Sequence, residues 1–390
     1  MDAGWESSGT GILSIEAGLG EGCAACASPI PNERSPVQLF TPVHLGSLPL
    51  RNRVVMAPLT RVRSGSDGVP NDLVVEYYGQ RATTGLIVSE GTYTSPESQA
   101  YAGQPGIVTP EQIAGWRRVT DAVHERSGLI VMQLMHGGRV THPAVNGGRD
   151  AVGPSAIAID GEVRTPEGKS AYPVPVAADP QDIIAQHVIA ARNAISAGMD
   201  GVEIHSANGY LLHEFLAPSS NQRDDEFGGS PAARARMGIA VITAVAKEIG
   251  ADRVGVRISP SHDIQDVIES DAADTAITYT TLLDGISGLG LAYLSVLHSD
   301  PAGEFIQELR GHFGGPLVAN SGFGVITSRE DASALIEGGK ADAVAVGRML
   351  IANPDLVRRW TEERELNEPD ASTFYGPGAH GYTDYPALAS

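Results

Sequence analysis

The chain has 390 residues, of which 42% are hydrophobic, enough to build a large soluble core. Its longest apolar runs are far too short to cross a bilayer, so we expect no membrane partner. The formal net charge of −20 argues against nucleic acid as a partner, because phosphates would be repelled, and we attribute this charge to solubility. The N-terminus lacks the basic stretch of a secretory signal, which predicts a cytoplasmic protein.

Residues 1–35 are rich in Gly, Ala, Ser and Glu and show no sustained periodicity. This composition predicts a flexible N-terminal extension ahead of a single domain over residues 36–388. The two cysteines, Cys23 and Cys26, lie in this extension. Such a pair can be a redox dithiol or half a zinc site, but no second pair and no strand–helix unit accompanies it. We therefore expect neither a metal site nor a disulfide framework.

One pattern repeats after a predicted hairpin around Gly46 and Ser47. A short apolar run is followed by a polar or glycine-rich turn and then by a longer amphipathic segment. Eight apolar runs are predicted to be buried strands, at residues 53–58, 85–90, 129–134, 201–205, 253–258, 291–296, 316–320 and 341–347.

Between the strands, proline at the start and glycine near the end of a segment indicate helix boundaries. Predicted helices include residues 109–123, 180–198, 231–249 and 327–336. In the second of these, the predicted buried face consists of Ile184, Val188, Ala191 and Ile195.

Eight strand–helix units predict an α/β protein with the (β/α)8, or TIM-barrel, fold and an N-terminal hairpin cap. A doubly wound open sheet is the alternative, but the first strand is not followed by a G-x-G-x-x-G turn. Residues 140–176 are too many for a tight loop after the third strand. They predict an excursion that covers one face like a lid.

The most informative segment is 201–216. Val202 and Ile204 predict a buried strand, and His205, Asn208 and Tyr210 follow within six residues. His and Asn can each donate a hydrogen bond to one oxygen atom, while a Tyr can supply a proton. Taken alone, these residues also fit a polar turn with Tyr210 packed in the core.

Other polar residues end the remaining strands, and active sites of such barrels lie at these ends. Each one alone has a structural explanation, such as capping or ion pairing, but their position on one rim indicates a binding site. They are Thr60, Gly91, Gln133, His136, Arg257, Asn320 and Arg348.

The last two strands predict a phosphate site. Gly322, Gly324 and Gly347 let the backbone approach an anion, and Arg348 can bind it with two hydrogen bonds. The alternative is that these glycines serve only as turn residues. Gln133 can pair with the imide edge of a flat ring, and Arg257 can neutralise an anionic ring. Together with the phosphate site, these residues fit flavin mononucleotide (FMN).

Several longer motifs carry a family resemblance over residues 36–388. The chain resembles the Old Yellow Enzyme family of FMN-dependent ene-reductases. The motifs are Met56-Ala-Pro-Leu-Thr-Arg, Val88-Ser-Glu-Gly-Thr, Met132-Gln-Leu-Met-His-Gly-Gly-Arg, His205-Ser-Ala-Asn-Gly-Tyr-Leu-Leu, Asn221-Gln-Arg-Asp-Asp-Glu-Phe-Gly-Gly-Ser, Val256-Arg-Ile-Ser-Pro, Val346-Gly-Arg and Ala379-His-Gly-Tyr-Thr-Asp-Tyr-Pro.

The resemblance implies roles for individual residues in binding FMN. The flavin ring would contact Ala57, Pro58, Thr60, Gly91, Gln133 and Arg257. The phosphate would contact Gly322, Phe323, Gly324, Gly347 and Arg348.

The resemblance also implies a reaction. NADPH or NADH would reduce the flavin, and an electron-poor alkene such as an enone, enal, maleimide or nitroalkene would then bind. His205 and Asn208 would hold its oxygen, flavin N5 would deliver hydride, and Tyr210 would protonate the other carbon. Tyr375 and Met135 would line the substrate pocket, and Met135 stands where the family usually has Trp. We expect a monomer or a homodimer.

Three other functions are considered. A flavoenzyme of the same fold could catalyse desaturation or isomerisation in secondary metabolism. A metal-dependent lyase or hydrolase would need clustered ligands, for which only His136, His205 and Glu90 are candidates. A barrel that only binds a ligand would not need the combination of His205, Asn208 and Tyr210.

Overall fold

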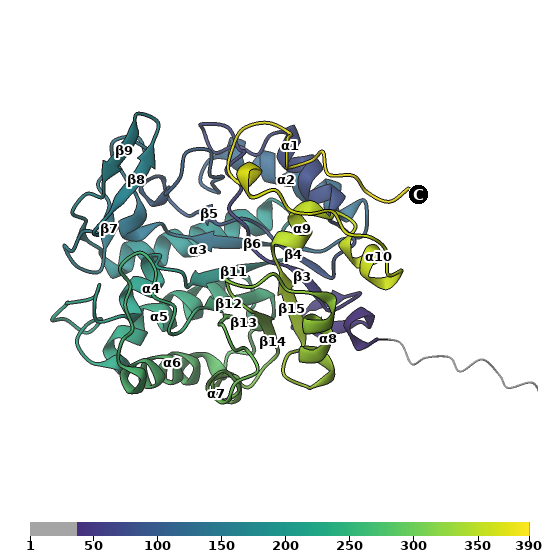
Figure 1. Cartoon of the computed structure of the whole chain (residues 1–390). Coiled ribbons are helices and arrows are strands. Elements are labelled where there is room, and N and C mark those ends of the chain that lie inside the picture. The colour runs from purple at the N-terminus through teal and green to yellow at the C-terminus, as the bar shows by residue number, and fades with distance from the viewer. Residues whose placement is uncertain (1–36, 390) are drawn as a thin grey trace, which may run out of the picture. The chain divides into compact units, whose positions relative to one another are not determined.

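The computed structural model describes residues 37–389, so the predictions for residues 1–35, including Cys23 and Cys26, lie outside the described residues. All eight predicted apolar runs form strands, and these pair in parallel, in chain order, around a closed barrel (Figure 1). A short additional strand, β5 (Thr92–Tyr93), pairs with β6. The barrel strands are β3 (Val54–Met56), β4 (Leu86–Val88), β6 (Ile130–Met135), β11 (Gly201–Ser206), β12 (Val254–Ile258), β13 (Tyr293–Leu297), β14 (Leu317–Asn320) and β15 (Ala343–Val346).

Helices follow the strands and form the outer layer of the barrel (Figure 1). The proline starts predicted for α2, α3 and α5 are confirmed, and each of these helices is capped by the side chain of the preceding Thr109, Asp179 or Ser230. None of the helices within residues 37–389 has the length and apolar character needed to span a membrane. The helices are α1 (Asp72–Gln80), α2 (Pro110–His124), α3 (Pro180–Ser196), α4 (Leu211–Leu216), α5 (Pro231–Ile249), α6 (Ala272–Ser287), α7 (Glu304–Phe313), α8 (Arg329–Glu337), α9 (Arg348–Ala352) and α10 (Leu356–Thr361), with 3-10 turns η1 (Gln38–Phe40), η2 (Pro96–Ser98), η3 (Gly138–Val140), η4 (Ala251–Arg253) and η5 (Ala371–Thr373).

The buried face of α3 differs from the predicted one. Of the four predicted residues only Ala191 is fully buried, and Ile184, Val188 and Ile195 are half-buried. Small residues allow the helix to approach the barrel closely, and this closeness decides which side faces inward. The fully buried side chains are those of Ile183, His187, Ala190, Ala191 and Ala194.

The predicted hairpin closes the N-terminal end of the barrel. Strands β1 (Val43–Leu45) and β2 (Leu48–Leu50) pair in antiparallel fashion, so that Gly46 and Ser47 form a two-residue turn. Gly46 has a φ of 58°, which a type II′ turn requires at its first central position. Leu45, Leu48 and Leu50 pack against apolar side chains near the N-terminal end of the barrel, and this apolar layer keeps water out of that end.

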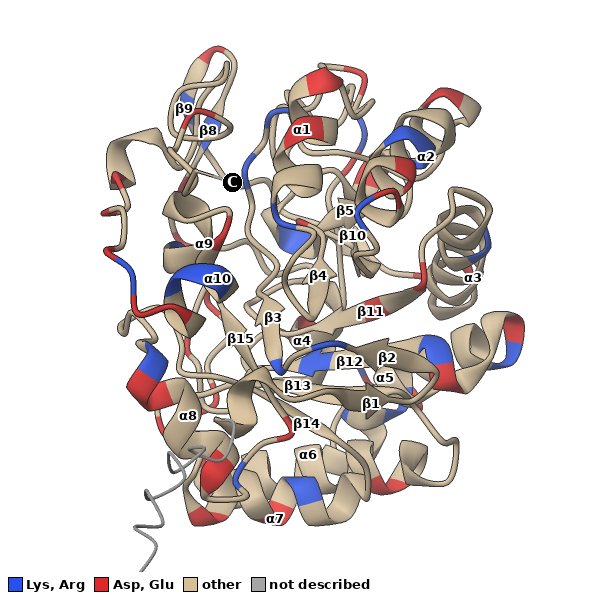
Figure 2. Ribbon diagram, turned by 90° about the vertical axis from the view of Figure 1, so that its right-hand side faces the viewer, with Lys and Arg blue, Asp and Glu red and all other residues tan. Residues whose placement is uncertain are grey.

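Charge is distributed unevenly over the fold. Lys, Arg, Asp and Glu lie mainly on the outer helices and loops, whereas the barrel strands are almost free of them (Figure 2). The exceptions are Glu203 on β11 and Arg257 on β12, both buried. Burying a charge costs free energy unless the charge is paired or contacts a ligand. These two residues therefore indicate that a functional site lies in this part of the barrel.

The excursion after β6 contains regular structure that the sequence did not predict. Its strands β8 and β9 form an antiparallel hairpin, and β7 pairs with β10 in parallel. The fully buried Arg139 ties the excursion down by donating to the carbonyl oxygens of Ile157, at 3.3 Å, and Gln265, at 3.1 Å. The strands are β7 (Val152–Gly153), β8 (Glu162–Thr165), β9 (Gly168–Ala171) and β10 (Val176–Ala177).

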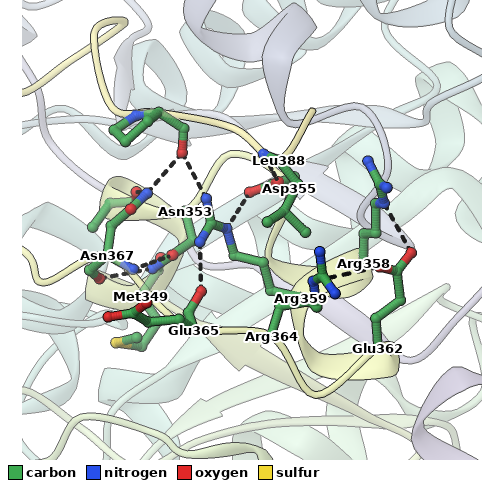
Figure 3. A network of polar contacts seen from close by, with 12 residues as sticks. Met349, Asn353, Asp355, Arg358, Arg359, Glu362, Arg364, Glu365, Asn367 and Leu388 are labelled. Atoms are coloured by element: carbon green, nitrogen blue, oxygen red, sulfur yellow. Dashed lines mark hydrogen bonds and ion pairs between the residues drawn. The ribbon is translucent and has the colours of Figure 1, made fainter. Parts of the chain in front are cut away.

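The C-terminal segment is anchored by a buried arginine (Figure 3). Arg359 donates to the carboxylate of Asp355 at 2.7 Å and to the carbonyl oxygen of Pro386 at 2.7 Å. Asp355 also accepts the backbone N–H of Leu388 at 2.7 Å. A second anchor lies nearer the barrel mouth, where Arg63 donates to the carbonyl oxygens of residues 373, 374, 378 and 380. The segment that carries Tyr375 is therefore held at both ends.

We expect Arg359→Ala to lower the free energy of unfolding by about 2 kcal/mol, because it leaves half-buried Asp355 and backbone carbonyls without a donor. The measurement is urea unfolding of the purified protein. Arg236 on α5 pairs with Glu226 at the surface, at 3.3 Å, and serves as the control. Arg236→Ala should cost less than about 1 kcal/mol, and equal losses in the two variants would contradict the anchoring role.

Candidate functional site

A tight turn after β11 brings the three predicted catalytic residues together. Asn208 and Gly209 both have positive φ, 58° and 78°, and the N–H of Tyr210 donates to the carbonyl oxygen of Ala207 at 3.3 Å. Two successive residues with positive φ define a type I′ turn, for which Asn-Gly is the preferred sequence. The turn reverses the chain, so that the rings of His205 and Tyr210 lie 5.1 Å apart.

His205 and Asn208 both keep hydrogen-bonding capacity unused. The Nδ1 of His205 and the Oδ1 of Asn208 are buried and have no partner in the described part of the chain. Burial, with a smaller contribution from the positive charge of Arg257, lowers the pKa of His205 well below 6.5. The imidazole is therefore neutral and carries one N–H. Unsatisfied buried polar groups are rare in folded proteins, and two of them side by side indicate a place for a polar ligand atom.

Tyr210 lies beside them and is linked to a second tyrosine. Its hydroxyl is 2.8 Å from that of Tyr101, which comes from the loop after η2. Burial raises the pKa of Tyr210 to about 12, although the Tyr101 hydroxyl opposes this effect. The phenol is therefore protonated at neutral pH. Met135 and Tyr172 pack in the same cluster as Tyr210.

Parallel pairing aligns further polar residues inside the barrel. Glu203 is opposite Gln133 on β6, and His205 is opposite Arg257, which in turn is opposite Ser295 on β13. Gln133 donates to Glu203 at 2.8 Å, and Arg257 donates to Ser295 at 3.1 Å. Burial raises the pKa of Glu203, and the nearby Arg257 and Gln133 oppose that shift. The Nε of Arg257 has no partner among the described residues.

A cavity opens beside this polar group, at the ends of β3, β14 and β15. Asn320 shapes it by donating to the carbonyl oxygen of Ala345 at 2.8 Å and accepting the N–H of Gly322 at 3.2 Å. Gly322 has a φ of 84°, and a Cβ added there would meet its nearest atom only at 3.8 Å. The space above this backbone is open to a ligand. The lining includes Ala57, Pro58, Arg257, Asn320, Gly322, Phe323, Gly347 and Arg348.

The lining of this cavity does not include the other residues predicted to bind the cofactor. Gly91 adjoins Gln133, since a Cβ added to it would lie 3.4 Å from the Gln133 Oε1. Thr60 is half-buried in the loop after β3, and Gly324 is exposed at the turn after β14. Tyr375 is 69% exposed on the C-terminal segment.

His136, noted at the end of the third predicted strand, is turned away from these groups. It is fully buried, its ring lies 6.5 Å from that of His187 on α3, and burial lowers its pKa to about 3. Within residues 37–389, no group of three or more His, Cys, Asp and Glu side chains is placed to hold a metal ion. The metal-dependent alternative therefore has no ligand set in this part of the chain.

Four residues of the site were missed in the sequence. Glu203 had a usable signal, because the two-residue period of a strand places it on the same face as His205. Tyr101, Ser259 and Gln265 come from loops, where no periodicity indicates direction. Ser259 accepts the N–H of Asn208 at 2.8 Å, and Gln265 donates to its carbonyl oxygen at 2.7 Å.

The residues present fit flavin mononucleotide. The cavity offers the buried, incompletely paired guanidinium of Arg257, with Gln133 beside it, for the polar edge of a flat ring. At Gly322 and Gly347 an added Cβ would meet no atom closer than 3.4 Å, so the backbone there leaves room for a phosphate, and Arg348 follows Gly347 in the lining.

Comparisons with known proteins agree with this fit. The model of the NADH:flavin oxidoreductase / NADH oxidase family matches residues 38–367. A probable flavin mononucleotide-dependent alkene reductase of Leishmania infantum is 42% identical over 362 residues, which cover 90% of this chain and 97% of that protein. The 12-oxophytodienoate reductase 1 of Oryza sativa subsp. japonica is 39% identical, covering 90% and 93%.

Solved structures show the same architecture. Morphinone reductase superposes with a TM-score of 0.84 at 41% identity, covering 90% of this chain and 96% of that one. An old yellow enzyme homologue from Zymomonas mobilis gives the same TM-score at 38% identity, covering 90% and 100%. The chain therefore belongs to the NADH:flavin oxidoreductase / NADH oxidase family and is an FMN-dependent oxidoreductase of the Old Yellow Enzyme type.

Proposed function

We propose that the protein reduces the C=C bond of small electron-poor alkenes with NADPH or NADH as the reductant. One observation carries this proposal: the tight turn after β11 brings His205 and Asn208, which can donate from a ring nitrogen and from Nδ2, beside the protonated phenol of Tyr210. Two donors for one oxygen and an acid nearby are the groups that an activated alkene needs. Relatives named for alkene and 12-oxophytodienoate reduction support the same reading.

The residues that would hold FMN divide into two groups. Ala57, Pro58, Thr60, Gly91, Gln133 and Arg257 would contact the ring, and Gly322, Phe323, Gly324, Gly347 and Arg348 would contact the phosphate. When bound and reduced, FMN supplies a hydride for the β-carbon of the alkene. Arg257 provides a fixed positive charge for the electron-rich ring, and Glu203 holds the Gln133 amide in one orientation through their 2.8 Å hydrogen bond.

His205 and Asn208 would act on the carbonyl or nitro oxygen of the substrate. Negative charge develops on this oxygen as the β-carbon gains hydride. Donors that are already in place stabilise that charge more strongly than they stabilise the neutral substrate, and therefore they increase the rate. The neutral state of His205, which follows from its lowered pKa, lets it donate without carrying a buried charge.

Tyr210 would deliver the proton that completes the reaction at the α-carbon. With a pKa of about 12, it holds its proton until a strongly basic carbon is formed next to it. The Tyr101 hydroxyl, 2.8 Å away, can then donate to the phenolate that remains. Met135 and Tyr375 would border the space for the rest of the substrate.

A matched pair of ring compounds tests the proposed function. We expect the protein to oxidise NADPH or NADH rapidly with cyclohex-2-enone, maleimides or nitroalkenes under anaerobic conditions. Cyclohexene has the same C=C bond but no oxygen for His205 and Asn208, so it should not be reduced. Stopped-flow absorbance of the flavin measures both half-reactions. A protein that stays colourless after addition of FMN, or reduces no activated alkene, would refute the proposal.

Tyr210→Phe should slow reoxidation of the reduced protein by an enone about 100-fold or more, because the general acid is lost. Reduction by NADPH or NADH needs no proton from this residue and should remain within about twofold. Tyr172→Phe is the control, since it removes a neighbouring hydroxyl that is not bonded to Tyr210. Equal losses in both half-reactions would contradict the role of Tyr210 as proton donor.

His205→Ala combined with Asn208→Gly should weaken phenol binding about 100-fold, because two hydrogen bonds to a charged oxygen are lost. Glycine is chosen at position 208 because it keeps the left-handed backbone of the turn. The measurement is titration of the FMN-loaded protein with a phenol, followed by the charge-transfer band. Unchanged phenol affinity would exclude the proposed oxygen site, and unchanged FMN affinity shows that the cofactor site is intact.

A further inference from the structure

Two buried residues that do not line the cavity lie behind the Asn208–Gly209 turn. His213, on α4, accepts the N–H of Gly209 through its Nδ1 at 2.9 Å. Its Nε2 lies 3.4 Å from Oε1 of Glu269, which comes from the loop after β12. Their side chains are 0% and 3% exposed. These contacts connect the backbone of the turn, through an imidazole, to a buried carboxylate.

The direction of these contacts is fixed by chemistry. A backbone N–H only donates, so the Nδ1 of His213 must be the acceptor and its proton must be on Nε2. Nε2 lies 3.4 Å from Oε1 of Glu269 without the geometry of a hydrogen bond, so the contact between the ring and the carboxylate is electrostatic. The other oxygen of Glu269 accepts the N–H of Ser261 at 2.7 Å. Burial raises the pKa of Glu269, but His213 and Ser261 outweigh this effect and the net shift is downward, so the carboxylate is ionised.

The turn gains from such support because Asn208 occupies the left-handed region. Asn tolerates this region better than most residues do, but it still adopts it less readily than Gly. Three directional contacts fix the two peptides of the turn: those of Ser259 and Gln265 with Asn208, and that of His213 with Gly209. Strained backbone persists where the surrounding structure determines it in this way.

We propose that His213 and Glu269 are positioning residues that hold the Asn208–Gly209 turn, and thereby keep the Asn208 carboxamide beside His205. This inference rests on the proposed role of His205 and Asn208 as the oxygen site. It differs from simple packing, because the contact that matters is a hydrogen-bond acceptor at one backbone N–H. Without that acceptor the N–H is buried and unpaired, and the turn is free to rearrange.

Two substitutions separate the acceptor from the packing. His213→Asn places its Oδ1 where Nδ1 stands and so keeps an acceptor for Gly209. His213→Leu has similar bulk but no acceptor. In the full-length FMN-loaded protein, we expect His213→Leu to weaken phenol binding about tenfold. His213→Asn should stay within about threefold of the wild type, with FMN affinity unchanged in both variants.

His187→Leu is the matched control, because His187 is equally buried but lies on α3 and does not bond to the turn. It should lower the melting temperature without changing phenol affinity. Equal phenol affinities of His213→Leu and the wild type would overturn the inference, as would equal losses in His213→Leu and His213→Asn. If His213→Leu cannot be purified as a folded, FMN-loaded protein, Glu269→Gln is tested in its place. Unchanged phenol affinity in Glu269→Gln would then overturn the inference.

The proposed function and this inference fail in different ways. A wild-type protein that binds no phenol contradicts the oxygen site itself, and the inference falls with it. A wild-type protein that binds phenol and loses that affinity on Asn208→Gly, but not on His213→Leu, keeps the oxygen site and refutes only the positioning role.

Discussion

The parallel pairing of β11 with β6 on one side and β12 on the other is the constraint on which the site depends. It places Glu203 opposite Gln133 and His205 opposite Arg257, all on the inner face. Because the barrel is closed, a shift of β11 by one residue would turn these polar groups outward and bring apolar Val202 and Ile204 into the barrel. The strand therefore positions Glu203 and His205 together with the start of the Asn208–Gly209 turn.

The same barrel is apolar at one end and polar at the other. The hairpin β1–β2 seals the N-terminal end with leucines, so that Tyr293 can fill the interior over Gly255, where a Cβ would lie 2.3 Å from its ring. Glu203 is opposite Gly255 and so lies in the same layer as Tyr293, whereas Arg257 is one layer nearer the C-terminal end of the barrel; the opposite charges of these two buried residues offset part of the cost of removing them from water. The unpaired atoms of Arg257 and His205 lie at that end, where a ligand can satisfy them.

Sequence patterns predicted most of this arrangement. Strands and helix starts followed from apolar runs and from Pro, Gly and capping residues, which act locally. The inner face of α3 was predicted wrongly, because burial there depends on how closely small residues let the helix approach its neighbours. Tyr101 could not be predicted, since it meets Tyr210 across 109 residues of chain. His213 and Glu269 come from different elements, and only the tertiary structure brings them together.

The residues proposed to carry the chemistry are held more rigidly than the residues that border the space for the substrate. His205 is fixed by the barrel strand, and the backbone of the Asn208 turn is bound on several sides. The residues that border the remaining space come instead from separate loops, such as that of Tyr101, and from the C-terminal segment with the exposed Tyr375. Loops tolerate substitution better than strands do. Changes in these loops can therefore alter which alkene is accepted while His205, Asn208 and Tyr210, the proposed oxygen site and proton donor, keep their geometry.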